Sequence, residues 1–214
     1  MSDERREQAA ADRNEPSNWN LPNLLTTVRI LLVPLLGWLL LSYDGASSGY
    51  RVWAFVVFAI AIATDKVDGD LARKHNLVTN FGKMMDPIAD KALTGMAFIG
   101  LSIIGDLWWW VTIVVLGREW FITFLRLWVI RYGVMAASRG GKIKTTAQAA
   151  ALMGLILPFR ELSGGLEPVG EGLWWLAVVV MGFAVLITVV TGLDYVRDAL
   201  RLRRQGRADE PPAT

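Results

Sequence analysis

The sequence contains no cysteine and a single histidine, His75, among its 214 residues. The chain therefore cannot form disulfides, zinc–thiolate sites, a cysteine nucleophile or a multi-histidine metal centre. Charge is scarce as well: 20% of the residues are charged, and the net charge of +2 is too small to indicate nucleic-acid binding. Hydrophobic residues, by contrast, make up 53% of the chain and cluster in long runs. These runs indicate an integral membrane protein.

Six apolar segments are long enough, as helices, to cross a bilayer core about 30 Å thick. The sequence therefore predicts an all-α membrane protein with six transmembrane helices in a catalytic domain of residues 21–204. Polar tails, residues 1–20 and 205–214, flank this domain, and the first lacks the apolar stretch of a signal peptide. The expected spans are residues 24–41, 52–70, 86–104, 107–130, 146–159 and 173–196.

Basic residues predict the orientation of these spans. They gather in the two tails, in the loop between the second and third spans, and in the loop between the fourth and fifth. The other loops hold little more than Arg51 and Arg160. We therefore expect both termini on the cytoplasmic side of the inner membrane. Tryptophans at residues 108–110 and 174–175 would form an aromatic belt at the outer ends, with core packing as the alternative.

Four aspartates lie at the cytoplasmic ends of the second and third spans. Asp65 and Asp68 stand three residues apart, and Asp86 and Asp90 four apart, so each pair shares a helix face. Two antiparallel helices joined by a short loop can bring the pairs together. Each charge in a span costs roughly 2.5–3.5 kcal/mol, so such a pocket calls for hard cations such as Mg²⁺, Mn²⁺ or Ca²⁺. Solvated aspartates at helix ends are the alternative.

Neighbouring residues suit a phosphate-bearing substrate in this pocket. Gly69 would let a substrate approach the backbone, and Gly82 would let the second and third helices pack tightly. Pro87 would fall just inside the start of the third helix, where its missing N–H costs little. Arg73 stands where it can meet a phosphate.

The spacing of these residues resembles the signature of the CDP-alcohol phosphatidyltransferase family, D-x2-D-G-x2-A-R-x8-G-x3-D-x3-D. The resemblance implies a six-helix membrane domain, a homodimer, an active site open to the cytoplasm and two divalent cations, Mg²⁺ or Mn²⁺. It implies that Asp65, Asp68 and Asp86 bind metal. It gives Asp90 the role of general base, with a possible metal contact. The CDP-diacylglycerol nucleotide would lie against Asp68, Gly69, Ala72 and Arg73.

Three further segments resemble the phosphatidylglycerophosphate synthase branch of that family, so that the resemblance extends over residues 22–148. They are LPNLLTTVRI at 21–30, GREWFITFLR at 117–126 and GKIKTTAQ at 141–148. This branch implies glycerol 3-phosphate as the acceptor, whose phosphate needs basic partners. Thr26 and Arg29 could line the same mouth. The candidates for binding the acceptor phosphate are Arg118, Arg126, Lys142 and Lys144.

Simpler explanations exist for these cations. The two lysines could serve as positive-inside anchors, and the two arginines could pair with Glu119 or extend to the membrane interface.

The predicted activity is transfer of the phosphatidyl group of CDP-diacylglycerol to glycerol 3-phosphate. The products are phosphatidylglycerophosphate and CMP, formed by metal-assisted direct displacement. An alternative within the family is another acceptor such as inositol phosphate. An alternative of another class is a divalent-cation transporter, although its carboxylates should be spread along a path through several spans. A lipid-binding scaffold without chemistry would leave the position of Asp90 unexplained.

Overall fold

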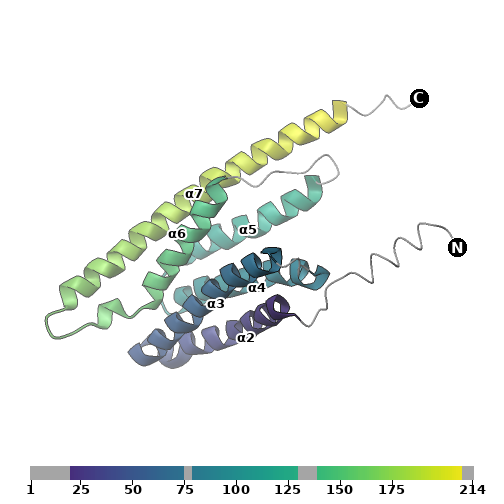
Figure 1. Cartoon of the computed structure of the whole chain (residues 1–214). Coiled ribbons are helices and arrows are strands. Elements are labelled where there is room, and N and C mark those ends of the chain that lie inside the picture. The colour runs from purple at the N-terminus through teal and green to yellow at the C-terminus, as the bar shows by residue number, and fades with distance from the viewer. Residues whose placement is uncertain (1–19, 75–78, 130–138, 209–214) are drawn as a thin grey trace.

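The computed structural model shown in Figure 1 describes residues 20–74, 79–129 and 139–208. These residues form six α-helices and two short 3-10 helices, η1 (Ser42–Gly45) and η2 (Phe159–Glu161), and the described part contains no strand. The all-α prediction is therefore confirmed, and each of the six expected spans lies wholly or mostly on one helix. The helices are α2 (Leu21–Leu41), α3 (Ser48–Lys74), α4 (Asn80–Ile103), α5 (Trp109–Val129), α6 (Arg139–Ile156) and α7 (Glu167–Ala208).

Local sequence signals explain where α2 and α4 begin. The side chain of Asn20 accepts a hydrogen bond from the backbone N–H of Asn23, and Thr79 caps α4 in the same way. Because Thr79 starts α4 earlier than expected, Pro87 lies inside this helix, and its predicted place at the helix start was wrong. A tight turn follows α4, with Gly105 at a φ of 83°, a backbone conformation that favours glycine.

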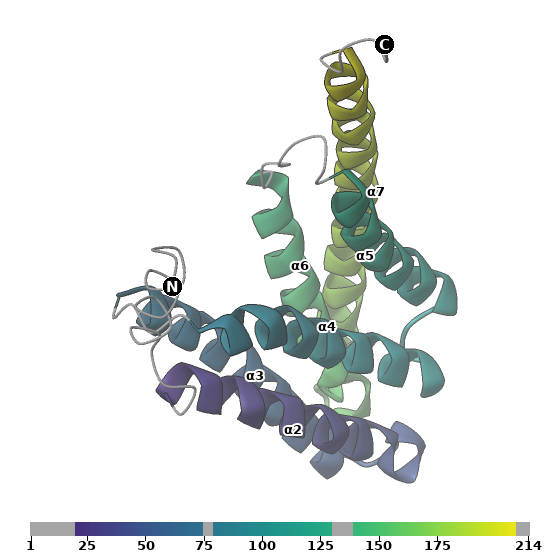
Figure 2. The same ribbon diagram turned by 90° about the vertical axis from the view of Figure 1, so that its right-hand side faces the viewer.

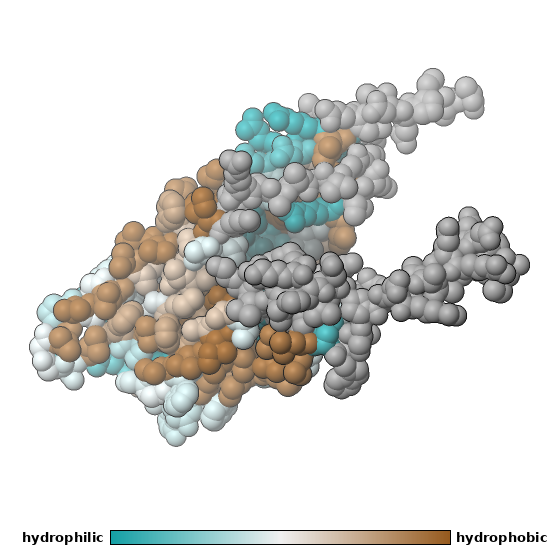
Figure 3. Space-filling model, in the orientation of Figure 1, coloured by the Kyte–Doolittle hydropathy of each residue, from teal (hydrophilic) through white to brown (hydrophobic). Residues whose placement is uncertain are grey.

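Three of the described segments are long and apolar enough to cross a membrane. They are Asn23–Gly45, Ser48–Asp65 and Glu167–Arg203, and they contain most of the first, second and sixth expected spans. Crossing by α4, α5 and α6 stays a prediction. The visible surface in Figure 3 is broadly apolar over the helices, and outward-facing large side chains suit contact with lipid. Examples that are more than half exposed are Leu31, Trp38, Ile113, Phe124, Val179 and Leu186.

The six helices pack as two groups of three. Helix α2 packs along both α3 and α4, while α7 packs along α5 and α6. In Figure 2, α7 runs across α2 and α4, and its C-terminal part extends beyond the other helices. Helices α3 and α4 touch each other much less than each touches α2. The two aspartate-bearing helices therefore meet mainly through α2, rather than directly as the sequence suggested.

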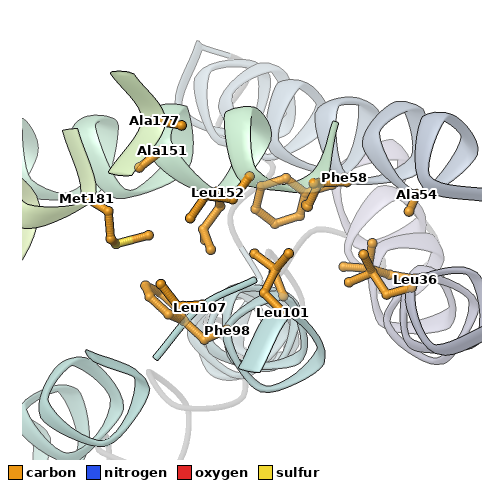
Figure 4. Packing of buried hydrophobic residues seen from close by; sticks show 14 of the residues in the cluster. Leu36, Ala54, Phe58, Phe98, Leu101, Leu107, Ala151, Leu152, Ala177 and Met181 are labelled. Carbon is orange, nitrogen blue, oxygen red and sulfur yellow. The ribbon is translucent and has the colours of Figure 1, made fainter. Parts of the chain in front are cut away.

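The hydrophobic core lies where the two groups join, as Figure 4 shows. Phe58 from α3 and Leu152 from α6 are completely buried, and they face Phe98 and Leu101 from α4. On the α6–α7 side, a Cβ added to Gly154 would lie only 2.7 Å from the Cβ of Ala177, so these two helices approach closely. This packing fixes α4, α6 and α7 relative to one another at the level of the core.

Candidate active site

Two aspartates of the expected site are held by side chains from α2. The Thr26 hydroxyl donates a 2.6 Å hydrogen bond to Oδ1 of Asp86 on α4. Arg29, which is only 1% exposed, places a terminal guanidinium nitrogen 2.8 Å from Oδ1 of Asp65 on α3. Its Nε donates to the carbonyl of Ala61, so the guanidinium is fixed at two points. The Asp65 side chain is 46% exposed, and its carboxylate therefore lies between a buried cation and the outside.

A second contact ties the start of α4 to α2. The Thr79 hydroxyl donates to Oδ1 of Asn23 at 2.9 Å and accepts from the N–H of Gly82 at 3.0 Å. A Cβ on Gly82 would lie 2.9 Å from the same Asn23 oxygen, so a side chain there would disturb the contact. The predicted close approach at Gly82 therefore exists, but it is made to α2 and not to α3 as expected.

These contacts give α2 a role that the sequence did not predict. Asn23, Thr26 and Arg29 follow one another at intervals of three and so share one helix face. That Thr26 and Arg29 could also line the mouth of the acceptor site stays a prediction. The structure brings them to the aspartates of α3 and α4.

The donor chemistry of this region fits hard divalent cations. Carboxylate oxygens are the ligands such ions prefer, and ligating carboxylates are normally held by outer hydrogen-bond donors, as Thr26 and Arg29 hold Asp86 and Asp65. Among the side chains that the structure describes, no group of three or more acidic or histidine residues stands ready to hold an ion. Asp68, the other aspartate that α3 contributes to the expected metal site, has its backbone on the helix, but its side chain is not among those that the structure describes.

A cluster of cations lies between α5, α6 and α7. Arg118 on α5 and Lys144 on α6 both form ion pairs with Oε1 of Glu119, the former at 3.1 Å. Arg118 also donates to the hydroxyl of Thr191 on α7 at 3.0 Å. Its Nε is buried without a hydrogen-bond partner in the described part of the chain. With two cations and one anion, the cluster keeps one net positive charge and an unused donor, which suits an anionic ligand.

Arg126, another of the candidates for binding the acceptor phosphate, also contacts α7. Its terminal nitrogen donates to the hydroxyl oxygen of Tyr195 on α7 at 2.7 Å. The guanidiniums of Arg126 and Arg118 lie 4.8 Å and 5.6 Å from the centre of the Tyr195 ring. Arg118 and Arg126, which stand eight residues apart, therefore share one face of α5.

Sequence reasoning missed the contribution of α7 and treated Glu119 only as an alternative partner of the arginines. A signal was present in the sequence. Thr188, Thr191 and Tyr195 are spaced by three and four residues, so they form a polar stripe on one face of an otherwise apolar helix. All three are buried, and Thr188 accepts a hydrogen bond from Gln148 of α6 at 3.1 Å.

Asp90 on α4 joins the two parts of the site. Its carboxylate is within electrostatic reach of Asp65 and Arg29 and also of Glu119 and Lys144. The next residue, Lys91, donates a 2.5 Å hydrogen bond to Thr123 and so connects α4 to α5. The aspartate region and the cation cluster are therefore near each other, and Asp90 is within reach of charges from both.

Several predicted site residues have backbones on described helices but side chains outside the described residues. No contact is therefore assigned to them. On α3 they are Asp68, Gly69, Ala72 and Arg73, and on α6 the residue is Lys142.

A separate cavity of about 230 Å³ lies at the opposite end of the helices. Its lining includes Asp44, Arg51, Asp106 and Trp174, none of which was predicted for the site. Arg51 pairs with Asp106 there, and the cavity contains none of the described residues that surround Asp90. It is therefore distinct from the candidate active site.

Comparison with known proteins agrees with the signature. A relative from Mycobacterium tuberculosis (strain H37Rv), described as a probable phosphatidylglycerophosphate synthase, is 50% identical over 182 residues, which cover 85% of this chain and 82% of the relative. A Bacillus subtilis (strain 168) protein described as a CDP-diacylglycerol–glycerol-3-phosphate 3-phosphatidyltransferase is 39% identical, over 83% of this chain and 93% of its own length.

The sequence profile of one family extends this likeness along most of the chain. The profile of CDP-alcohol phosphatidyltransferase matches residues 19–190. The match therefore continues into α7, past residue 148, where the resemblance read from the sequence ended. On these grounds, the chain belongs to the CDP-alcohol phosphatidyltransferase family.

Proposed function

We propose that this protein transfers the phosphatidyl group of CDP-diacylglycerol to glycerol 3-phosphate, giving phosphatidylglycerophosphate and CMP. The observation that carries the proposal is that Asp90 is within electrostatic reach both of Asp65 on α3 and of the cation cluster of α5–α7. A pyrophosphate substrate and an acceptor phosphate need these two environments side by side. The names of the relatives in M. tuberculosis and B. subtilis support the same reaction.

The proposed roles follow this division of the site. Asp65, Asp68, Asp86 and Asp90 would hold two divalent cations, Mg²⁺ or Mn²⁺. When bound, these would neutralise the charge of the pyrophosphate and of the departing CMP. The nucleotide would lie against Asp68, Gly69, Ala72 and Arg73 of α3. The acceptor phosphate would be bound by Arg118, Arg126, Lys142 and Lys144.

In the reaction, Asp90 accepts the proton of the primary hydroxyl of glycerol 3-phosphate. That oxygen attacks the β-phosphorus of CDP-diacylglycerol, a new P–O bond forms, and the bond to the CMP oxygen breaks. The cations of α5 and α6 hold the acceptor by its phosphate, so its hydroxyl end is directed toward Asp90 on α4. The diacylglycerol chains remain in the bilayer. We further propose that the enzyme is a homodimer in the inner membrane, with six crossings and its site facing the cytoplasm.

An assay with radiolabelled glycerol 3-phosphate tests the proposal directly. Purified protein with CDP-diacylglycerol should form labelled lipid and CMP, and a chelator should abolish both. Asp90→Asn should reduce kcat by about 100-fold or more, as expected for loss of a general base. Asp198→Asn, at an exposed aspartate of α7, is the matched control and should leave kcat unchanged.

Three results would contradict the proposal. Turnover of inositol phosphate but not glycerol 3-phosphate would overturn the acceptor assignment. Near wild-type turnover by Asp90→Asn, with metal binding intact, would overturn the role of Asp90 as base. Divalent-cation flux into proteoliposomes without CMP release would favour the transporter alternative.

A further inference from the structure

Tyr195 makes the contacts that connect α7 to the cations of α5. It lies beyond residue 190, where the match to the family ends, and it is only 7% exposed. Its hydroxyl oxygen accepts the 2.7 Å hydrogen bond from Arg126, and its ring lies under the guanidiniums of both Arg126 and Arg118. One buried side chain therefore contacts two of the cations proposed to bind the acceptor phosphate.

These contacts restrict both arginines. Two guanidiniums on one helix face repel each other, and each side chain has many rotamers to lose on binding an anion. The face of an aromatic ring attracts both cations, and the phenolic oxygen fixes the direction of one. Neighbouring residues of α7 add to this: Thr191 accepts from Arg118, and a Cβ on Gly192 would come within 3.4 Å of its Nε. Helix α7 thus forms the surface on which Arg118 and Arg126 are arranged.

We infer that Tyr195 is a positioning residue of the acceptor site, which holds Arg118 and Arg126 ready to bind the phosphate of glycerol 3-phosphate. The inference rests on the proposed function, since it needs those arginines to bind the acceptor. Tyr195 acts through the arginines and not on the reacting atoms. The acceptor phosphate does not change during the reaction, so the arginines bind it equally well in the ground state and in the transition state. Loss of Tyr195 should therefore raise KM for glycerol 3-phosphate and leave kcat unchanged.

The test uses two substitutions in the full-length enzyme in lipid nanodiscs. Tyr195→Phe keeps the ring and loses the hydrogen bond, and KM for glycerol 3-phosphate should rise about 3- to 10-fold. Tyr195→Leu loses both, and the rise should be about 10- to 50-fold. In each variant kcat and KM for CDP-diacylglycerol should stay within about twofold of wild type. Tyr43→Phe and Tyr43→Leu, at an exposed tyrosine of η1 on the opposite end of the molecule, are the matched controls and should change neither KM.

A double-mutant cycle separates positioning from simple packing. In an Arg126→Ala background, Tyr195→Phe should have no further effect on KM, because the hydrogen bond it removes is already gone. An equal rise of KM for both substrates, or an unchanged KM for glycerol 3-phosphate in Tyr195→Leu, would overturn the inference. The proposed function fails separately, if wild-type protein forms no labelled lipid from glycerol 3-phosphate.

Discussion

At the scale of single residues, Thr26 and Arg29 act on aspartates that belong to other helices. Thr26 is 2% exposed and Arg29 is 1% exposed, so both polar groups are buried at a contact between helices. Buried polar side chains are retained only when they are satisfied, and here each is satisfied by an expected metal ligand. The orientation of Asp86 and Asp65 therefore depends on α2, whose sequence contains no carboxylate.

Replacing Thr26 by valine should weaken the binding of divalent cations. The change removes the hydrogen-bond donor of Asp86 and keeps the side-chain shape, and losses of this kind typically cost about 10- to 100-fold in metal affinity. Mn²⁺ binding can be followed by electron paramagnetic resonance, and the Mg²⁺ concentration for half-maximal activity should rise in parallel. Thr27→Val is a matched control, because the bond that the Thr27 hydroxyl makes within the described part of the chain goes to the carbonyl of Asn23 in its own helix. Equal Mn²⁺ affinity in the two variants would exclude this role for Thr26.

At the scale of helices, the end of α6 is held by an arginine from α3. Arg51 is 7% exposed and donates to the backbone carbonyls of Leu155 and Ile156, the last two residues of α6. Carbonyls in the last turn of a helix have no N–H partner within the helix, so Arg51 supplies one. It also pairs with Asp106 in the turn between α4 and α5. One side chain thus joins three parts of the bundle at the end remote from Asp90.

Replacing Arg51 by alanine should therefore destabilise the protein without changing its chemistry. It leaves the Asp106 carboxylate and two carbonyls unpaired, a loss that costs about 3–5 kcal/mol for a buried ion pair. Thermal unfolding in detergent should show a lowered midpoint, while kcat per folded molecule stays near wild type. Arg160→Ala, at an exposed arginine that rests on Trp174, should shift the midpoint far less. A large loss of kcat in folded Arg51→Ala would show that the far end influences the site.

At the scale of the whole molecule, the described candidate residues gather at one end of the bundle. The same end holds the later part of α7, which Figure 1 shows extending past the other helices. With 42 residues, α7 is roughly 60 Å long, about twice the thickness of the bilayer core. In the predicted topology, its basic C-terminal part, which includes Arg197, Arg201 and Arg203, would emerge on the cytoplasmic side.

The absence of cysteine makes this orientation directly measurable. Single cysteines at Glu171 and Asp198, both exposed on α7, would stand about 40 Å apart along the helix. In intact spheroplasts, a membrane-impermeant maleimide should label Glu171→Cys, whereas Asp198→Cys should react only after permeabilisation. The unsubstituted protein, which has no cysteine, is the control. Labelling of Asp198→Cys from outside would reverse the predicted topology.

Periodicity and spacing predicted much of the fold and named the candidate residues of the site. The apolar runs predicted six helices, because a backbone buried in lipid must satisfy its own hydrogen bonds. The signature that contains Asp65 and Asp86 placed both residues near the ends of predicted spans. The position of Pro87 was wrong because a cap at Thr79 lies outside the apolar run that set the prediction. The roles of Thr26 and Tyr195 were not predicted, because their partners lie 60 and 69 residues away in sequence.

The sequence by itself determined the helices, the carboxylate pairs and the family, since these depend on periodicity and on residues close together along the chain. Only the tertiary structure decided that α2 holds the aspartates and that α7 supports the arginines. Those contacts depend on which helix faces meet, and that choice is made by long-range packing around Phe58, Phe98 and Leu152.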